Sequence, residues 1–440
     1  MYKVIRMAAV ALAVLLAASC SKDRPGGAAL LSQIGPDFDF ALMIDPAAVA
    51  RSAGDDALSR IHTVDSRVFE TLYTADGLDK ESALVVGYSH PVQSAILLTV
   101  TDGNALDKSL AARGYKSASR GVYTVYSVPD GSTPVFVTDE AAVLWVVKGE
   151  PAEAPSAVDA LKARIRPLPV WLTESFAKND DRACTFCVRP GADSLRTVGH
   201  VVLDGSRADI LFARHAADGS PAPFIASGRM QNIGKVAAAA ADTAAMLSVA
   251  VALPSATSLT DLLEQAGLYA GGKQKDALDS LNGCAALSFN MADPNSADWT
   301  DFSNFRLVLA AGTAPGAAPK VLGDLRATLA SAGVPVGAGK NLSVTFAGQR
   351  LLEASAPEPD MLLAGTPGYR PSAVPQLAAG TVVWVRADIP ARQPLLEMAG
   401  VSSGLRIRAE VVADRGKASI DFIGSDKGFI AGIIDILHTF

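Results

Sequence analysis

The 440-residue sequence is poor in cysteine, in aromatic residues and in net positive charge. It has four cysteines, 6% aromatic residues and a formal net charge of −6. An acidic chain with scattered basic residues is unsuited to nucleic acid and to electrostatic binding of anionic lipid. Beyond the first 20 residues no stretch reaches 18 uncharged apolar residues, so we expect no membrane-spanning helix in the body of the protein. The 49% hydrophobic content is typical of a globular chain.

The sequence also lacks the short motifs of common catalytic and metal-binding sites. It contains no G-x-S-x-G motif and no nucleotide-binding P-loop. Adjacent carboxylates such as Asp55 and Asp56 do not supply the two facing carboxylates of a glycosidase. The histidines stand in no H-x-x-x-H or H-E-x-x-H spacing, which is evidence against a helical zinc site. Because these motifs are all missing, we expect neither a metal site nor a cofactor, and we predict that the protein is not an enzyme. The five histidines, which we expect at the surface or in turns, are His62, His90, His200, His215 and His438.

The N-terminus has the pattern of an export signal. Two basic residues precede an apolar run over residues 7–16, and small residues then lead to Cys20. This arrangement resembles the lipobox of bacterial lipoproteins, although Ala17 stands where that motif usually has leucine. The resemblance implies that a signal peptide, residues 1–19, is removed and that Cys20 is acylated. A secretory signal with a chance cysteine and an uncleaved anchor are the alternatives, and the apolar run is short for an anchor.

Loss of residues 1–19 removes two basic residues and brings the formal net charge to −8. Membrane attachment would then depend on the acyl chains at Cys20, with residues 20–31 as the lipidated cysteine and tether. We expect a lipid-anchored protein of the outer membrane. Whether it faces the cell surface or the periplasm is open.

An internal repeat of about 200 residues organises the rest of the chain. Residues 195–212 match residues 405–422 at eight of 18 positions. Each block alternates apolar and polar residues around a turn, at Asp204-Gly205-Ser206 and at Asp414-Arg415-Gly416, and so predicts a β-hairpin. Weaker strand and helix patterns follow the same order in both halves, among them helix patterns over residues 104–113 and 319–332 that are each followed by a glycine.

These patterns predict an α+β fold of two similar tandem domains, with mainly antiparallel sheets covered by helices. The first repeat domain would span residues 32–230 and the second residues 241–440. The boundary would lie near 228–241, where the alanine run at 237–241 begins the second copy or links it. Whether the two repeats share one sheet is open.

The opening of the mature chain, Ile34-Gly-Pro-Asp-Phe-Asp-Phe-Ala-Leu-Met-Ile-Asp-Pro46, follows the short tether. In this it resembles a group of uncharacterised lipoproteins of Bacteroidetes, the DUF4836-like group. The resemblance implies an envelope location and a similar architecture. It implies no activity.

Two further features are candidates for a site. Cys184 and Cys187 form a Cys-x-x-Cys pair, which could be a local disulfide, a redox couple or part of a metal site. Its flanks lack the tryptophan-rich thioredoxin signature and a strand-to-helix context, which favours a structural pair. Trp299 stands in a polar segment and is a candidate ligand contact, with a loop-anchoring role as the alternative.

The sequence therefore favours a non-enzymatic envelope lipoprotein with a binding or assembly role. Its partner would be a protein, a glycan or another surface component. A periplasmic carrier of a lipid or other hydrophobic ligand is the second hypothesis, because a sheet backed by helices can enclose an apolar cavity. An enzyme of unrecognised type is the third.

Overall fold

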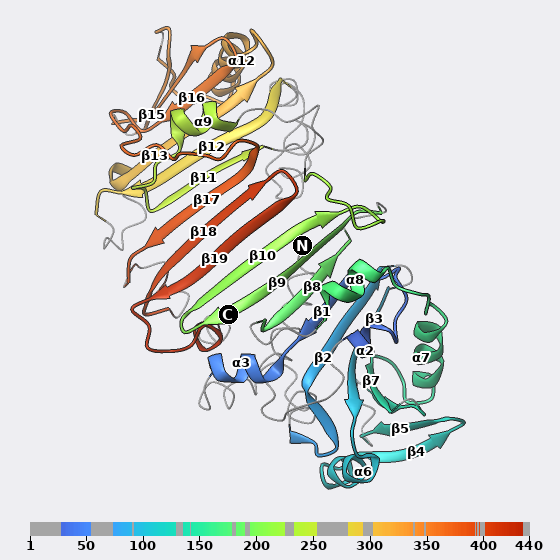
Figure 1. Ribbon diagram of the computed structural model, residues 1–440. Coiled ribbons are helices and arrows are strands. Elements are labelled where there is room, and N and C mark those ends of the chain that lie inside the picture. The colour runs from blue at the N-terminus through green and yellow to red at the C-terminus, as the bar shows by residue number, and fades with distance from the viewer. Residues whose placement is uncertain are drawn as a thin grey trace. The chain divides into compact units, whose positions relative to one another are not determined.

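A computed structural model provides the fold (Figure 1). The chain divides into two compact units, which we call the first unit (Met1–Ala222 with Ser425–Phe440) and the second unit (Pro223–Gly424). The predicted signal peptide and Cys20 lie outside the described residues. The described residues are 28–53, 74–89, 92–128, 135–140, 142–177, 182–189, 194–224, 233–252, 280–293, 302–337, 339–346, 349–391, 393, 396 and 401–433.

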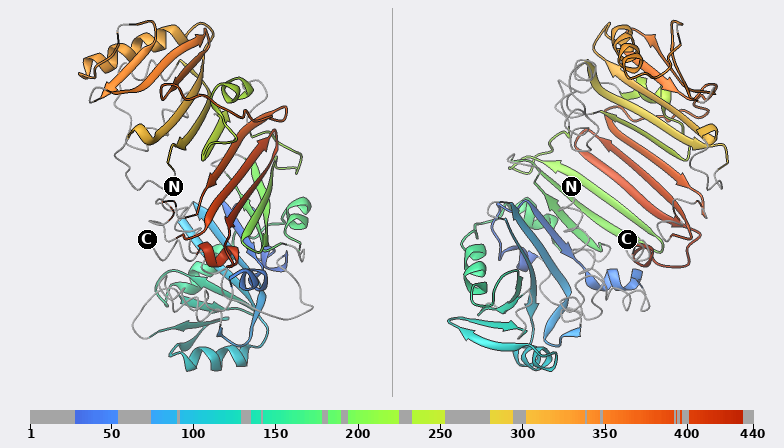
Figure 2. Two further views of the ribbon diagram at one scale, coloured as in Figure 1. Left: turned by 90° about the vertical axis from the view of Figure 1, so that its left-hand side faces the viewer. Right: turned by 180° about the vertical axis from the view of Figure 1, so that it is seen from behind.

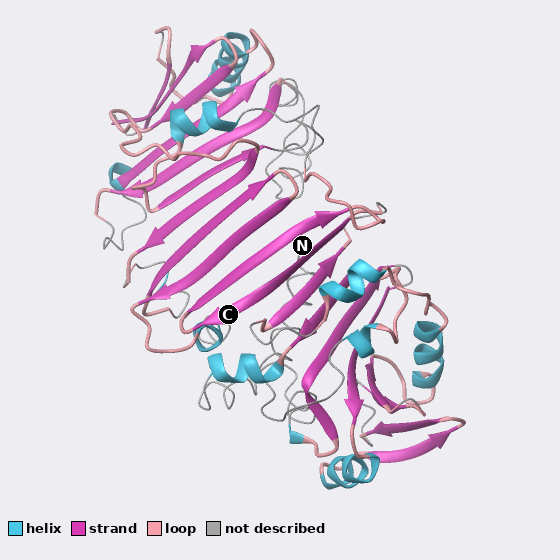
Figure 3. Ribbon diagram, in the orientation of Figure 1, coloured by secondary structure: helices cyan, strands magenta, loops and turns pink. Residues whose placement is uncertain are grey.

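The predicted fold class is wrong. Strand accounts for 45% of the described residues and helix for only 21%, and the pairings are antiparallel, so the fold is mostly antiparallel sheet and not α+β with helix-covered sheets (Figure 3). Apolar periodicity locates elements but does not set their lengths, and the strands run to 12 residues in one case, Leu78–Ser89. No helix in the described ranges is both long enough and apolar enough to cross a membrane.

The sheet of the first unit follows the order β10-β9-β8-β1-β2-β3-β7-β6-β5-β4, every pair antiparallel. Its strands are β1 (Phe40–Ile44), β2 (Leu78–Ser89), β3 (Val92–Val100), β4 (Lys116–Arg120), β5 (Tyr123–Ser127), β6 (Val135–Thr138), β7 (Val143–Val147), β8 (Cys184–Val188), β9 (Arg196–Asp204) and β10 (Arg207–His215). Its helices are α2 (Ala28–Leu31), α3 (Pro46–Ala53), α6 (Gly103–Ala112), α7 (Ala154–Lys162) and α8 (Val170–Ser175).

The sheet of the second unit follows the order β19-β18-β17-β11-β12-β13-β16-β15-β14, again antiparallel throughout. Its strands are β11 (Leu247–Ala252), β12 (Leu281–Met291), β13 (Phe305–Thr313), β14 (Leu342–Phe346), β15 (Gln349–Glu358), β16 (Met361–Gly365), β17 (Thr381–Ile389), β18 (Gly404–Val412) and β19 (Arg415–Ile423). The helices are α9 (Ile233–Ala240), the short 3-10 turn η3 (Phe302–Asn304) and α12 (Ala318–Ser331).

Taken separately, the two units have the same strand order. The second order repeats the first when β11, β12 and β13 replace β1, β2 and β3, and when β14 to β19 replace β5 to β10. Only β4 has no full counterpart, and an isolated bridge between Val336 and Val344 stands in its place. Both β2 and β12 also carry a register irregularity near their N-terminal ends, after Leu78 and Leu281. These shared details extend the repeat well beyond the 18 aligned residues.

The main described core of the first unit lies on the sheet face that carries α2, α7 and α8 (Figures 1 and 2). Trp145 on β7 is fully buried in it, and its indole N–H donates to Asp139 Oδ2 at 3.0 Å. Asp139 is in turn paired with Lys162 Nζ of α7 at 2.6 Å. The helix is therefore held to the sheet by an ion pair as well as by the apolar contacts of Val158 and Leu161.

Candidate functional site

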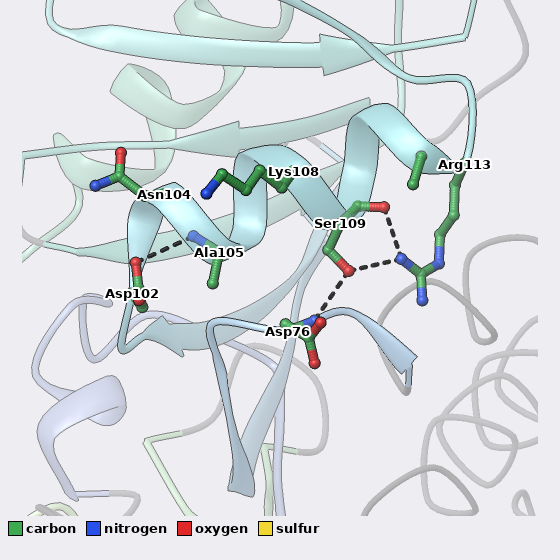
Figure 4. A pocket seen from close by; sticks show the side chains of 8 residues that line it. Asp76, Asp102, Asn104, Ala105, Lys108, Ser109 and Arg113 are labelled. Atoms are coloured by element: carbon green, nitrogen blue, oxygen red, sulfur yellow. Dashed lines mark hydrogen bonds between the residues drawn. The ribbon is translucent and has the colours of Figure 1, made fainter.

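A polar groove with a volume of about 440 Å³ lies beside α6 (Figure 4). A tight turn at Asp76-Gly77 brings the chain against the start of α6, because Gly77 has φ +83° and its carbonyl oxygen accepts from Thr101 N at 2.7 Å. Asp102 caps the helix by accepting from Ala105 N at 3.0 Å. The residues that line this α6 groove are Asp76, Asp102, Asn104, Ala105, Lys108, Ser109, Ala112 and Arg113.

The only hydroxyl in the groove is engaged in the fold. Ser109 Oγ accepts from Asp76 N at 3.0 Å and from Arg113 Nη1 at 2.6 Å. Arg113 Nη2 also donates to Thr74 Oγ1 at 2.6 Å. A serine nucleophile needs an adjacent base to accept its proton, and the residues lining the groove include no histidine. The α6 groove can therefore hold a small polar ligand, but it lacks a nucleophile-base pair.

The Cys-x-x-Cys pair lies on β8, where the strand separates the two thiols. Side chains three residues apart in a strand point to opposite faces of the sheet. Cys187 belongs to the core beneath α8, whereas Cys184 pairs with Ile44 on the other face. Both thiols are free. The predicted local disulfide does not fit this geometry, because the period of the strand directs the two sulfurs away from each other.

Burial also makes these thiols poor nucleophiles. It raises the pKa of Cys184 to about 12, with a further contribution from the nearby charge of Asp45. Burial raises the pKa of Cys187 as well, although Arg196 opposes the shift and lies 3.8 Å from the sulfur. Cys284 on β12 is also buried, and burial raises its pKa to about 11. All three thiols are protonated near neutral pH, which counts against a redox couple.

The other predicted residues give no metal or catalytic cluster. Trp299, His62, His90 and His438 lie outside the described residues. His200 is half-buried on β9, where burial and then the charge of Arg182 lower its pKa. Within the described ranges no three His, Cys, Asp or Glu side chains come together as metal ligands.

His215 has a structural contact that sequence reasoning missed. Its ring lies 5.0 Å from that of Trp171, between ring centres, and its Nδ1 is 3.0 Å from the Gly219 carbonyl oxygen. Trp171 donates to Ala217 O at 3.3 Å, so the pair fastens α8 to the turn after β10. These residues are distant in the sequence, and no local pattern connects them.

The second unit has an apolar sheet surface that is partly exposed. Four directly opposed side chains cross four strands: Leu309 on β13, Leu287 on β12, Val249 on β11 and Val385 on β17. Leu309 is 37% exposed and the other three are only partly buried. We call this set of four residues the apolar row.

The matching row of the first unit is better covered at two of its four positions. Ile96, Val85, Leu42 and Phe186 are opposed across β3, β2, β1 and β8; Ile96 and Val85 are buried, and Leu42 and Phe186 are partly buried. The helix α3 contacts β2 and β9 of this unit. Ile96, which occupies on β3 the place of Leu309 on β13, is only 9% exposed.

The sequence did contain a signal for this surface. Along β11 the bulky residues Leu247, Val249 and Val251 alternate with small ones. The small residues Ser248 and Ala250 are fully buried on the face where α9 contacts β11. A strand with a single buried face has its large apolar side chains on that face and polar ones on the other. In β11 the small residues lie beneath the helix and the large apolar residues lie on the opposite face. That alternation could have marked the apolar row as a surface with a role of its own.

Comparison with known proteins adds little. No protein-family model and no curated protein matches the chain. Crystal form I of TP0453 matches at TM-score 0.32 and 10% identity, over 44% of this chain and 80% of that one. Crystal form III of TP0453 matches at TM-score 0.32 and 10% identity, over 46% of this chain and 83% of that one. At these TM-scores the likeness supports no conclusion on fold or function.

Proposed function

We propose that this protein is a non-enzymatic lipoprotein of the outer membrane, anchored through Cys20, that binds a partner through the apolar row of its second unit. The partial exposure of the row carries the binding part of the proposal. Contiguous apolar surface on a soluble body is a common mark of an interaction site. The protonated thiols and the absence of a nucleophile-base pair along the α6 groove favour binding over catalysis.

A carrier of a lipid or other hydrophobic ligand is the second candidate, and the same surface favours it. The apolar row contains only aliphatic side chains, which offer no hydrogen bond to direct a polar partner. Organic extraction of the purified protein, followed by mass spectrometry, separates the two. A stoichiometric lipid in the extract would favour the carrier, and an empty extract would favour assembly with a macromolecule.

The binding surface can be tested with the apolar dye ANS. We expect Leu309→Glu to lower the fluorescence of bound ANS, because a carboxylate in the row disfavours an apolar ligand. Leu211→Glu is the matched control, since Leu211 is also an exposed leucine in a strand, at 46%, but lies in the first unit. Equal fluorescence of the two variants would contradict the proposal.

The anchor needs its own experiment. Cys20→Ala should abolish metabolic labelling with radioactive palmitate and release the protein from sedimented membranes, because the other cysteines are buried. Retained label in this variant would rule out Cys20 as the acylated residue.

A further inference from the structure

The second unit has a polar sheet surface built on β17 and β18. Arg386 on β17 is directly opposite Arg408 on β18, and Asp388 is directly opposite Arg406. These four side chains share one face, because alternate residues of a strand point the same way. Between 30% and 46% of each side chain is exposed. We call these four residues the arginine cluster.

A single carboxylate joins the three guanidinium groups. Asp388 Oδ2 accepts from Arg386 Nε at 3.0 Å and Oδ1 accepts from Arg406 Nε at 3.1 Å. Arg408 Nη2 lies 2.7 Å and 2.6 Å from the two oxygens. Burial acts to raise the pKa of Asp388, but the hydrogen bonds from Arg408 and Arg406 outweigh it and hold the pKa below its usual value. Asp388 is therefore ionised and its hydrogen-bonding capacity is largely used.

The arginines retain unused donors. Arg386 and Arg406 bind Asp388 only through Nε, and no described residue accepts a hydrogen bond from their terminal Nη groups. The second carboxylate nearby, Asp421, lies 3.9 Å from Arg406 Nη1, too far for a hydrogen bond. Three cations face two carboxylates, so the surface has a surplus positive charge in a chain whose net charge is −6. An anion fits this surplus, and the flat fork of a guanidinium suits a carboxylate.

An aromatic side chain lies on the same face. Trp384 precedes Arg386 by two residues on β17 and is directly opposite Glu410. It is partly exposed, and no described residue accepts from its indole N–H. Residues two apart in a strand are separated by about 7 Å. An aromatic ring beside guanidinium groups at this spacing could contact a sugar ring while the cations bind a charged group on it.

We propose that this face binds an anionic glycan whose sugars carry carboxylate groups, with Arg386 and Arg406 on the carboxylate and Trp384 against the sugar ring. The proposal concerns the polar face of the sheet and does not depend on the apolar row or on the lipid anchor. Charge complementarity selects an anion, and Trp384 favours a sugar over an acidic peptide. Lys417 and Glu410, paired at 3.2 Å, border the site on β19 and β18.

Calorimetry with oligomers of polygalacturonate tests the proposal, with fully methyl-esterified oligomers as the uncharged match. We expect binding of the acidic oligomer alone. Arg386→Gln and Arg406→Gln should each weaken it about tenfold, the effect of losing one charge-assisted contact. Arg350→Gln is the control, because Arg350 is also an exposed arginine of the second unit paired with a carboxylate. Arg386→Lys, which keeps the charge but loses the fork, should give an intermediate loss.

Three results would overturn the proposal. Equal binding of the methyl-esterified oligomer would show that the site does not recognise the carboxylate groups. Unchanged affinity in Arg386→Gln and Arg406→Gln, with circular dichroism as for the parent, would place the glycan elsewhere. Tighter binding of polyglutamate than of polygalacturonate would identify an acidic protein segment as the occupant. Leu309→Glu should leave glycan affinity unchanged, so failure of the apolar row and failure of this site are distinguishable.

Discussion

Cys184 and Cys187 lie on opposite faces of β8, one opposed to Ile44 and the other packed in the core beneath α8. We therefore expect both thiols to resist DTNB in the folded protein at about pH 8 and to react once guanidinium unfolds it. Non-reducing electrophoresis and mass spectrometry of the alkylated protein should show no linkage between them. A peptide that contains the oxidised pair would contradict this arrangement.

The buried thiol of Cys184 should make stability depend on alkaline pH. Burial raises its pKa from 9.0 to about 12 in the folded chain. Above about pH 9 the unfolded thiol loses its proton while the folded one keeps it, so the free energy of unfolding falls as pH rises toward 12. In urea titrations Cys184→Ala should lose less stability than the parent over this range. Parallel curves for the two proteins would show that this pKa is not raised.

The ion pair under α7 should be important for the stability of the first unit. The side chain of Asp139 is 1% exposed and bonds Lys162 and Trp145. Asp139→Ala leaves both partners without their acceptor, and we expect a loss of about 3 kcal/mol in the free energy of unfolding. Asp209→Ala removes an exposed pair with Arg207, and should cost under about 1 kcal/mol. Similar losses in urea unfolding would contradict the difference in burial.

The two hairpin turns should respond in opposite ways to exchange of glycine and alanine. Gly205 has φ +54° and Ala413 has φ +50°, a region that costs an alanine about 1 kcal/mol. Ala413→Gly should therefore stabilise the protein by about 0.5–1 kcal/mol, and Gly205→Ala should destabilise it by a similar amount. Thermal unfolding of both variants checks the signs.

The same hairpins show what a single sequence can and cannot predict. The turn at Gly205-Ser206 is where the pattern places it, between Asp204 and Arg207. The second turn is at Ala413-Asp414 and not at the expected Asp414-Arg415-Gly416. A slip of two residues keeps every side chain on its own face, so alternation of apolar and polar residues does not detect it. The aligned blocks therefore predict the two hairpins but not their register.

Local signals also predicted helix positions well. The pattern over 104–113 with a following glycine corresponds to α6, Gly103–Ala112, and the pattern over 319–332 corresponds to α12, Ala318–Ser331. The fold class and the candidate surfaces could not be obtained this way. The arginine cluster joins two strands about 20 residues apart, and the apolar row joins strands from Val249 to Val385. Such neighbours are set by strand pairing, which the local pattern of one sequence does not encode.

Photo-crosslinking at position 309 tests the central claim most directly. A benzoylphenylalanine residue would replace Leu309, or Leu211 as the control, and intact cells would be irradiated. We predict a discrete adduct, protein or extractable lipid, that forms at position 309 and not at position 211. Adducts of equal yield at the two positions, or none at either, would contradict a binding role for the apolar row.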